Sequence, residues 1–234
     1  DENMGWFSGF CSSVGSFFSS ACSALGSALS SFATSIASTL GSVISSLGPV
    51  AEALGKFANA FLQGMGILRP NETAEDMGDR ALQAAEKGIT PEKFQNFEAY
   101  MSELRNFDID PERSIKRSSA EKLVAGIGIG TVGMEDKFNL DRGSLNSMWL
   151  LPITNAEYFT PARMETLLTS GRLGGDVFAY LEKRLSGSEN QAFEKQLDID
   201  GNTDILYEAL DSAREKWAEL AKQVEARNNP DSTA

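Results

Sequence analysis

The 234-residue sequence contains no histidine. Histidine is the commonest general base in enzymes and the commonest side-chain metal ligand, and it completes the Ser-His and Cys-His arrangements that activate nucleophiles. Its absence excludes those arrangements. We therefore expect a protein that is not an enzyme and that holds no cofactor and no metal ion.

The acidic segment Asp198–Asp204 comes nearest to a calcium-binding loop. An EF-hand loop needs glycine at its sixth position and glutamate at its twelfth. Here Gly201 is fourth and Ala209 is twelfth. We interpret the segment as a turn that leads to Thr203, the expected N-cap of the last helix.

Cysteine and basic residues are also scarce. Cys11 and Cys22 are the only thiols, and on one helix they would lie about 16 Å apart, too far for a disulfide. We interpret them as small apolar side chains of a reducing compartment.

Acidic residues outnumber basic ones by 33 to 21, which gives a net charge of −12. Because a surface of that sign repels phosphate backbones, we expect no nucleic-acid partner.

The first part of the chain lacks charge: no charged residue occurs between Asn3 and Ala51. Apolar residues recur there, and on to Leu68, at the spacing of one helix face, and the positions between them are mostly serine, glycine and threonine. We predict that the apolar face is buried in a membrane or a partner. The candidate residues for that contact are Trp6, Phe7, Phe10, Val14, Phe17, Phe18, Leu25, Phe32, Ile36, Leu40, Val43, Leu47, Leu54, Phe57 and Phe61.

The uncharged segment is too long for a single upright crossing of a bilayer. As one helix, residues 5–47 would span about 64 Å, and the hydrocarbon core of a bilayer is about 30 Å thick. The segment thus fits a hairpin of two spans turning near Ser30–Ser31, or one helix lying in the membrane interface. Gly48-Pro49 should break or kink the helix. Burial in a homo-oligomer, or under the rest of the chain, explains the same pattern without a membrane.

From residue 69 onward the chain reads as an acidic helical domain, since prolines preceded by threonine or aspartate mark several helix starts. A glycine-rich apolar run, residues 123–133, is too short to span a membrane and is expected to be a buried helix or turn. The predicted fold is all-α: a hydrophobic, Ser-Gly-Ala-rich amphipathic helical segment (residues 1–68) and a soluble acidic helical domain (residues 69–234). Helices are expected near 73–87, 91–106, 111–125, 161–169, 175–185 and 203–227.

A long uncharged amphipathic segment, mainly residues 4–68, joined to an acidic helical domain resembles the architecture of bacterial pore-forming effectors of the type VI secretion class. The apolar start lacks the basic n-region of a secretory signal and is too long for its apolar core, which agrees with export by such a route. The resemblance implies an antibacterial toxin, made in the cytoplasm, that inserts into the inner membrane of a target cell and depolarises it. It also implies a secretion carrier or tube protein and an immunity protein as partners, and we expect a homo-oligomer.

Two other classes of protein fit the same sequence. A phage ejection or internal virion protein also passes through a tube and then enters a membrane. A non-membrane assembly protein would instead bundle its N-terminal helices. Conductance across a planar bilayer separates the two membrane-active classes from the assembly protein.

Overall fold

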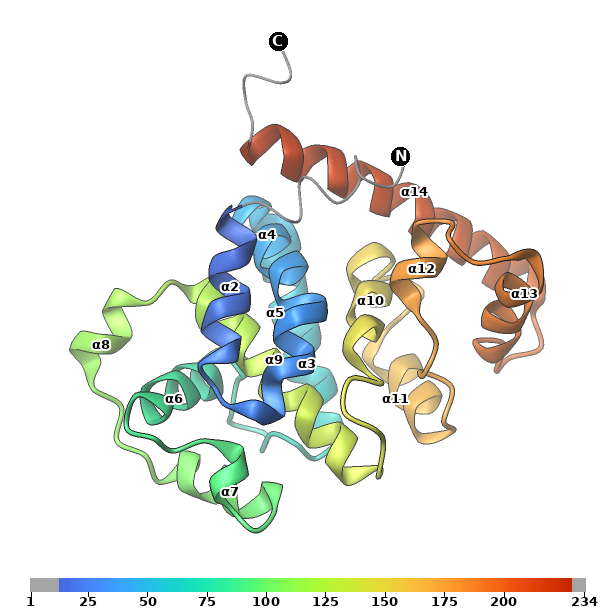
Figure 1. Cartoon of the computed structure of the whole chain (residues 1–234). Helices are drawn as coiled ribbons and strands as arrows, with labels where there is room; N and C mark the ends of the chain where they lie inside the picture. Colours follow the sequence, from blue (N-terminus) through green and yellow to red (C-terminus); the bar gives the residue numbers. More distant parts are fainter. Residues whose placement is uncertain (1–12, 229–234) are drawn as a thin grey trace.

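A computed structural model describes residues 13–228, and every regular element among them is helical, which confirms the all-α fold. Helices pack around one buried helix, α9 (Ser119–Lys137), and the long C-terminal helix α14 (Thr203–Asn228) lies across one end of the molecule (Figure 1). The other α-helices longer than one turn are α2 (Ser13–Ser23), α4 (Ser38–Ser46), α5 (Gly48–Gly64), α6 (Ala74–Glu86), α7 (Phe97–Arg105), α8 (Pro111–Lys116), α10 (Leu150–Thr154), α11 (Pro161–Thr169), α12 (Val177–Leu181) and α13 (Gly187–Gln196).

The uncharged N-terminal segment folds as a hairpin, to which we refer as the N-terminal hairpin (residues 13–46; Figure 1). Its first arm is α2, and the chain then turns at residues 24–26. The turn precedes the expected Ser30–Ser31, because Gly26 adopts a φ of 119° that residues with a side chain rarely adopt. The return arm consists of η1 (Ser27–Leu29), α3 (Ser30–Phe32), the π-helical turn η2 (Ala33–Ala37) and α4.

The two arms of the hairpin pack closely against each other. A Cβ atom on Gly41 would lie 2.1 Å from the Phe18 ring, so glycine is needed at that crossing. The Ser19 hydroxyl donates a 2.8 Å hydrogen bond to the carbonyl of Ala33, in the π-helical turn. The return arm ends where the Gly48-Pro49 pair predicts a break, since the residue before that pair leaves the helical region and α5 starts with the proline in its first turn.

Helix α9 is the centre of the fold, and it is buried from Leu123 to Glu135. Helices α2, α4, α5 and α6 pack around it. Helix α6 crosses α9 so closely that a Cβ atom on Gly126 would lie 1.8 Å from the carbonyl oxygen of Ala74. A Cβ atom on Gly78 would likewise lie 1.8 Å from the carbonyl oxygen of Lys122, on α9. The glycine-rich run is therefore the buried helix that was expected, and its glycines permit contact between two backbones.

The predicted helices 91–106 and 111–125 are each interrupted by an N-cap residue. The Asn96 side chain accepts a hydrogen bond from the third residue of α7, and the Ser118 side chain does the same for α9. Such side chains satisfy the free N–H groups of a new helix start and compete with continuation of the preceding helix. The result is a short turn, η3 (Pro91–Lys93), before α7, and a separate α8 before a longer α9.

Several differences from the expected helices lie in the C-terminal part: α10 was not expected, and α12 covers only part of the expected helix 175–185. Helix α13 forms where the sequence pattern indicates none, and it begins with a capping box in which Ser186 and Glu189 exchange side-chain and backbone hydrogen bonds. The last helix is capped by Asn202, whose side chain accepts a hydrogen bond from the third residue of α14, rather than by the expected Thr203. Asparagine is among the strongest N-cap residues.

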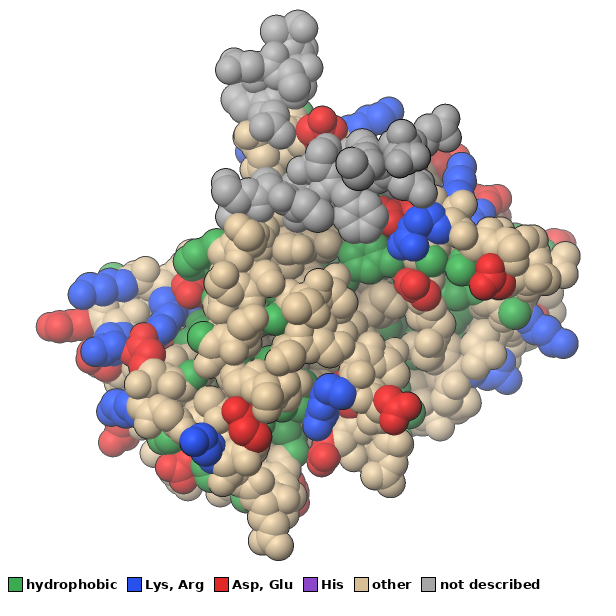
Figure 2. Space-filling model, in the orientation of Figure 1, with side chains coloured by type: hydrophobic (Ala, Val, Ile, Leu, Met, Phe, Trp, Pro, Cys, Tyr) green, Lys and Arg blue, Asp and Glu red, His purple; other side chains and the backbone are tan. Residues whose placement is uncertain are grey.

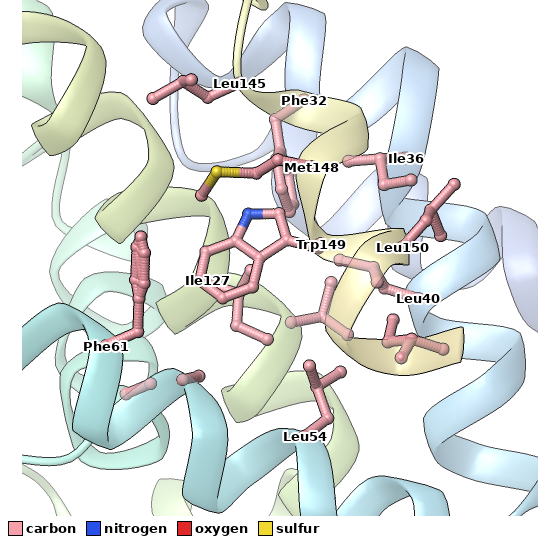
Figure 3. Close-up of a cluster of buried hydrophobic side chains, with 14 of the residues drawn as sticks. Phe32, Ile36, Leu40, Leu54, Phe61, Ile127, Leu145, Met148, Trp149 and Leu150 are labelled. Carbon is pink, nitrogen blue, oxygen red and sulfur yellow. The ribbon is translucent and has the colours of Figure 1, made fainter. Parts of the chain in front are cut away.

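One hydrophobic core contains side chains from the N-terminal hairpin and from the rest of the chain. Trp149, in η4 (Asn146–Trp149), is fully buried and donates its indole N–H to the Thr131 hydroxyl of α9 at 2.9 Å. Residues 13–68 and 69–228 thus share this core, and the division of the chain into domains 1–68 and 69–234 stays a prediction. Figure 3 shows the cluster around the indole, with labels on Phe32, Ile36, Leu40, Leu54, Phe61, Ile127, Leu145, Met148 and Leu150.

Candidate membrane-active hairpin

The structure places most of the candidate contact residues inside the fold. Trp6, Phe7 and Phe10 lie outside the described residues, and so does the side chain of Val14. Phe17 is 52% exposed. The other candidates are buried by the protein's own helices: Phe18, Leu25, Phe32, Ile36, Leu40, Val43, Leu47, Leu54, Phe57 and Phe61. The fold itself therefore shelters the described part of the apolar face except for Phe17.

The outer face of the hairpin has no charged side chain, because the sequence has none between Asn3 and Ala51. In Figure 2 the surface over α2 is mainly tan and green, and red and blue side chains lie around it. Surface helices of globular proteins typically carry charged and polar residues on their outer face, so this hairpin is unusual. Its exposed residues are small, hydroxylic or apolar: Ser16, Phe17, Ser20, Ser23, Ala24, Ser27, Ser30, Thr34, Ser35 and Ser45.

Some hydroxyl groups of the hairpin are hydrogen-bonded within it. Thr34 Oγ1 donates to the Ser30 carbonyl at 3.0 Å, and Ser45 Oγ donates to the Gly41 carbonyl at 2.6 Å. A bond to the preceding helical turn satisfies a hydroxyl group without water. Because polar groups in the core of a bilayer need partners inside the protein, these hydroxyl groups suit both water and lipid.

The return arm of the hairpin has the length of a membrane span. Residues Ser27–Ser46 are 20 helical residues, or about 30 Å at the rise of an α-helix, which matches the hydrocarbon core of a bilayer. Among residues 13–228, this is the one helix long and apolar enough to cross a membrane, and more than half of it is buried inside the fold. The core helix of a soluble protein passes the same test, so length and composition alone do not assign a membrane.

The loop after α9 leads into Asn146, the first residue of η4, which contacts the hairpin and is 6% exposed. Its side-chain amide donates hydrogen bonds to the hydroxyl groups of Ser31, at 3.0 Å, and Ser35, at 2.8 Å. Both serines belong to the return arm. The amide therefore fixes the middle of that arm to the rest of the fold.

Glu135, on α9, holds that loop in place. Its side chain is almost fully buried, and Oε2 accepts hydrogen bonds from the N–H groups of Gly143, at 2.9 Å, and Leu145, at 3.1 Å. Burial raises the pKa of Glu135, and the two N–H groups and Arg142 oppose that rise without cancelling it. The position of Asn146 thus depends on a buried carboxyl group.

We expect Glu135→Ala to destabilise the fold by about 3 kcal/mol, because two backbone N–H groups lose their acceptor. Asp136→Ala is the matched control, since Asp136 is the exposed neighbour, and it should change stability by less than about 0.5 kcal/mol. Urea unfolding followed by circular dichroism measures both variants. Equally small changes in the two would show that the carboxylate does not hold the loop.

A second polar cluster lies in a cleft of about 570 Å³ lined by α5, α6, α8 and α9. The Ser114 hydroxyl donates to the buried Asp79 carboxylate at 2.6 Å, and Lys122 Nζ donates to that hydroxyl at 3.1 Å. Helix α8 has no buried residue, so these bonds fasten it to α6 and α9, and we assign the cluster that structural role. No group of three or more potential metal ligands occurs within residues 13–228.

Comparisons with protein families, with curated proteins and with solved structures found no match to this chain. The properties of the hairpin are therefore the basis for a candidate function. The hairpin is uncharged on both faces, some of its hydroxyl groups are bonded internally, and its return arm has the length of a membrane span.

Proposed function

We propose that this protein inserts its N-terminal hairpin into a target membrane. The observation that supports the proposal most directly is the absence of charge on both faces of the hairpin, the inner one apolar and buried, the outer one mostly serine and threonine. A lysine, arginine or aspartate at the centre of a membrane helix costs about 2.5–3.5 kcal/mol. The hairpin can enter lipid without that cost.

Insertion also keeps the apolar side chains of the hairpin out of water. Leu25, Phe32 and Leu40 are buried in the fold, and lipid offers them a similarly apolar environment. The hydrophobic free energy of these side chains is therefore similar in the two states. Departure of the hairpin uncovers α9, and its run from Leu123 to Met134 has no charge either, so that helix is also suited to contact lipid.

The chemistry of the outer face favours a pore over a single lipid-bathed anchor. Small residues recur four positions apart on that face, as in the exposed pairs Ser16/Ser20 and Ser30/Thr34, and such pairs allow close contact between helices. Several copies of the hairpin would bring the hydroxyl groups of their return arms together around water, while α2, with its exposed Phe17, would face lipid. We therefore propose a homo-oligomeric, pore-forming antibacterial toxin of the type VI secretion class, which depolarises the target cell.

The same proposal includes partners for the stage before insertion: a secretion carrier or tube protein and an immunity protein. Residues 69–234 hold nearly all of the charged side chains and would present the surface that these partners recognise. The protein would be made in the cytoplasm of the producing bacterium and would act at the inner membrane of the target cell.

A second candidate is a non-membrane helical assembly protein. It is favoured by the burial of Leu25, Phe32 and Ile36 in the chain's own core, which needs no lipid. The two candidates differ at the outer face of α2, because only membrane insertion requires that face to meet lipid. A phage ejection protein would share the membrane step, so the same experiment tests it.

Phe17→Asp should reduce the leakage of lipid vesicles about tenfold or more, because it places a charge on the outer face of α2. Phe17 is 52% exposed, so the replacement should leave the fold intact. Ile205→Asp is the matched control, since Ile205 is 51% exposed but lies on α14, outside the hairpin. Release of an entrapped dye from phosphatidylethanolamine–phosphatidylglycerol vesicles and from phosphatidylcholine vesicles measures the effect.

Wild-type protein and the Ile205→Asp variant should release dye at equal rates. No release by wild-type protein from either kind of vesicle would reject membrane insertion and favour the assembly protein. Equal release by wild type and Phe17→Asp would show that the outer face of α2 does not enter lipid.

A further inference from the structure

The turn of the hairpin contacts the carboxylate of Glu92, in η3. The N–H group of Ser27, the first residue of the return arm, donates to Glu92 Oε1 at 3.3 Å. A Cβ atom on Gly26 would lie 2.5 Å from Glu92 Oε2. The absence of a side chain at Gly26 therefore lets the carboxylate lie directly against the turn.

The ionised form of Glu92 is the form that binds the turn. Burial acts to raise the pKa of Glu92, but the N–H groups of Glu92 itself, Ser27 and Ala28 and the hydroxyl of Thr90 hold the pKa below its ordinary value. The first N–H groups of a helix have no partner within the helix, and the carboxylate supplies one. The contact is therefore formed at neutral pH.

Asn146 makes the second polar contact, deeper along the same arm. Its amide group donates hydrogen bonds to the hydroxyl groups of Ser31 and Ser35. Asn146 is buried, whereas Glu92 is exposed to water. Together the two side chains bind the turn and the first two helical turns of the return arm.

These hydrogen bonds differ in one respect from the apolar packing that also holds the hairpin against the rest of the fold. The hairpin has no charged residue, so apolar packing and hydrogen bonds hold it in place. Lipid replaces the apolar packing when the hairpin inserts, but it does not replace a specific carboxylate or amide partner. The free-energy difference between the docked and inserted states therefore depends strongly on these polar contacts.

We propose that Glu92 and Asn146 form a retaining clasp that keeps the hairpin docked until the protein meets a membrane. The inference rests on the proposed membrane insertion, and it assigns the two residues a regulatory role in that step. Loosening the clasp increases the fraction of molecules with a free hairpin, and hence the rate of insertion.

Cys22 reports opening of the clasp in the absence of lipid. It lies on α2, near the turn, and is fully buried without a disulfide partner. Burial, with a smaller effect of the Glu121 charge, raises the pKa of the Cys22 thiol to about 12. Since the thiolate is the reactive form, the docked hairpin should protect this thiol. The substitution Cys11→Ser leaves Cys22 as the only thiol in the chain.

In that background the test variants are Glu92→Gln, Asn146→Ala and the two combined. Glu98→Gln is the matched control, an exposed glutamate in the first turn of α7. We expect Cys22 to react with a maleimide roughly threefold to tenfold faster in each single variant, and faster still in the double variant. Dye release from vesicles should accelerate in the same order. Urea unfolding of each variant separates local opening from loss of the fold.

Unchanged Cys22 reactivity in Glu92→Gln and Asn146→Ala, equal to that of Glu98→Gln, would overturn the clasp whatever the leakage. Faster reaction of Cys22, without dye release by any of the proteins, would support the clasp and reject membrane insertion. Dye release at one rate by all the proteins, with Cys22 equally protected, would reject the clasp and leave insertion standing.

Discussion

Gly126→Ala is expected to destabilise the fold by about 3 kcal/mol or more, because the added methyl group overlaps backbone atoms. Its Cβ atom would lie 1.8 Å from the carbonyl oxygen of Ala74 and 2.5 Å from the carbonyl carbon. A side chain could rotate away from such a contact, but the backbone carbonyl of Ala74, in the first turn of α6, cannot. Helices α6 and α9 would have to separate, and thermal unfolding should occur about 10 °C lower.

Gly48→Ala supplies the matched control for that experiment. A Cβ atom on Gly48 would meet nothing within 4 Å, and the residue has no positive φ. The free energy of unfolding of Gly48→Ala should stay within about 1 kcal/mol of the wild-type value. Similar melting temperatures for Gly126→Ala and Gly48→Ala would contradict the close crossing of α6 and α9.

The helical spacing of apolar residues in the first 68 residues predicts which side chains form the inner face of the hairpin, but not which element covers that face. Leu25, Phe32 and Leu40 follow the helical period and are buried. The period does not predict the cover, which consists of α9, η4 and other elements from later in the chain. Those contacts depend on tertiary packing, so the sequence left a membrane, an oligomer, a partner and the chain itself as open alternatives.

The position of the hairpin turn shows where periodicity is insufficient. The apolar face continues through residues 24–26 without a break, so the pattern alone does not locate a turn there. Two properties define it: the positive φ of Gly26 and the carboxylate of Glu92, whose bonding partner Ser27 is 65 positions away. Contacts at that separation leave no trace in local spacing.

The polar residues of the candidate site were missed for the same reason. Asn146 reaches its two serine partners across 115 and 111 positions. One signal was available in the sequence: Asn146 has the one amide side chain in the otherwise largely apolar stretch from Leu145 to Ile153. A buried amide needs hydrogen-bond partners, and the serines of the uncharged segment are the most numerous hydroxyl groups in the chain.

Linking the hairpin covalently to the loop that holds it should abolish membrane activity. A Cβ atom on Gly143 would lie 3.4 Å from the Cβ atom of Ser31, close to the separation of about 3.5–4.5 Å found in disulfides. Ser31→Cys with Gly143→Cys, in a Cys11→Ser and Cys22→Ala background, therefore places two thiols within bonding range. Gly143 has a φ of 98°, so Gly143→Cys alone is the control for backbone strain.

Dye release from vesicles by the oxidised and reduced forms of this double-cysteine variant tests membrane insertion by the hairpin most directly. We expect the oxidised form to release dye only at the background rate, because the hairpin cannot leave the fold. Adding a reductant to the same sample should restore release at least as fast as that of the Gly143→Cys control, because the double variant also lacks the Ser31 hydroxyl that Asn146 binds. Rapid release by protein whose cross-link is complete by mass spectrometry would show that the hairpin need not leave the fold, and would contradict the proposal.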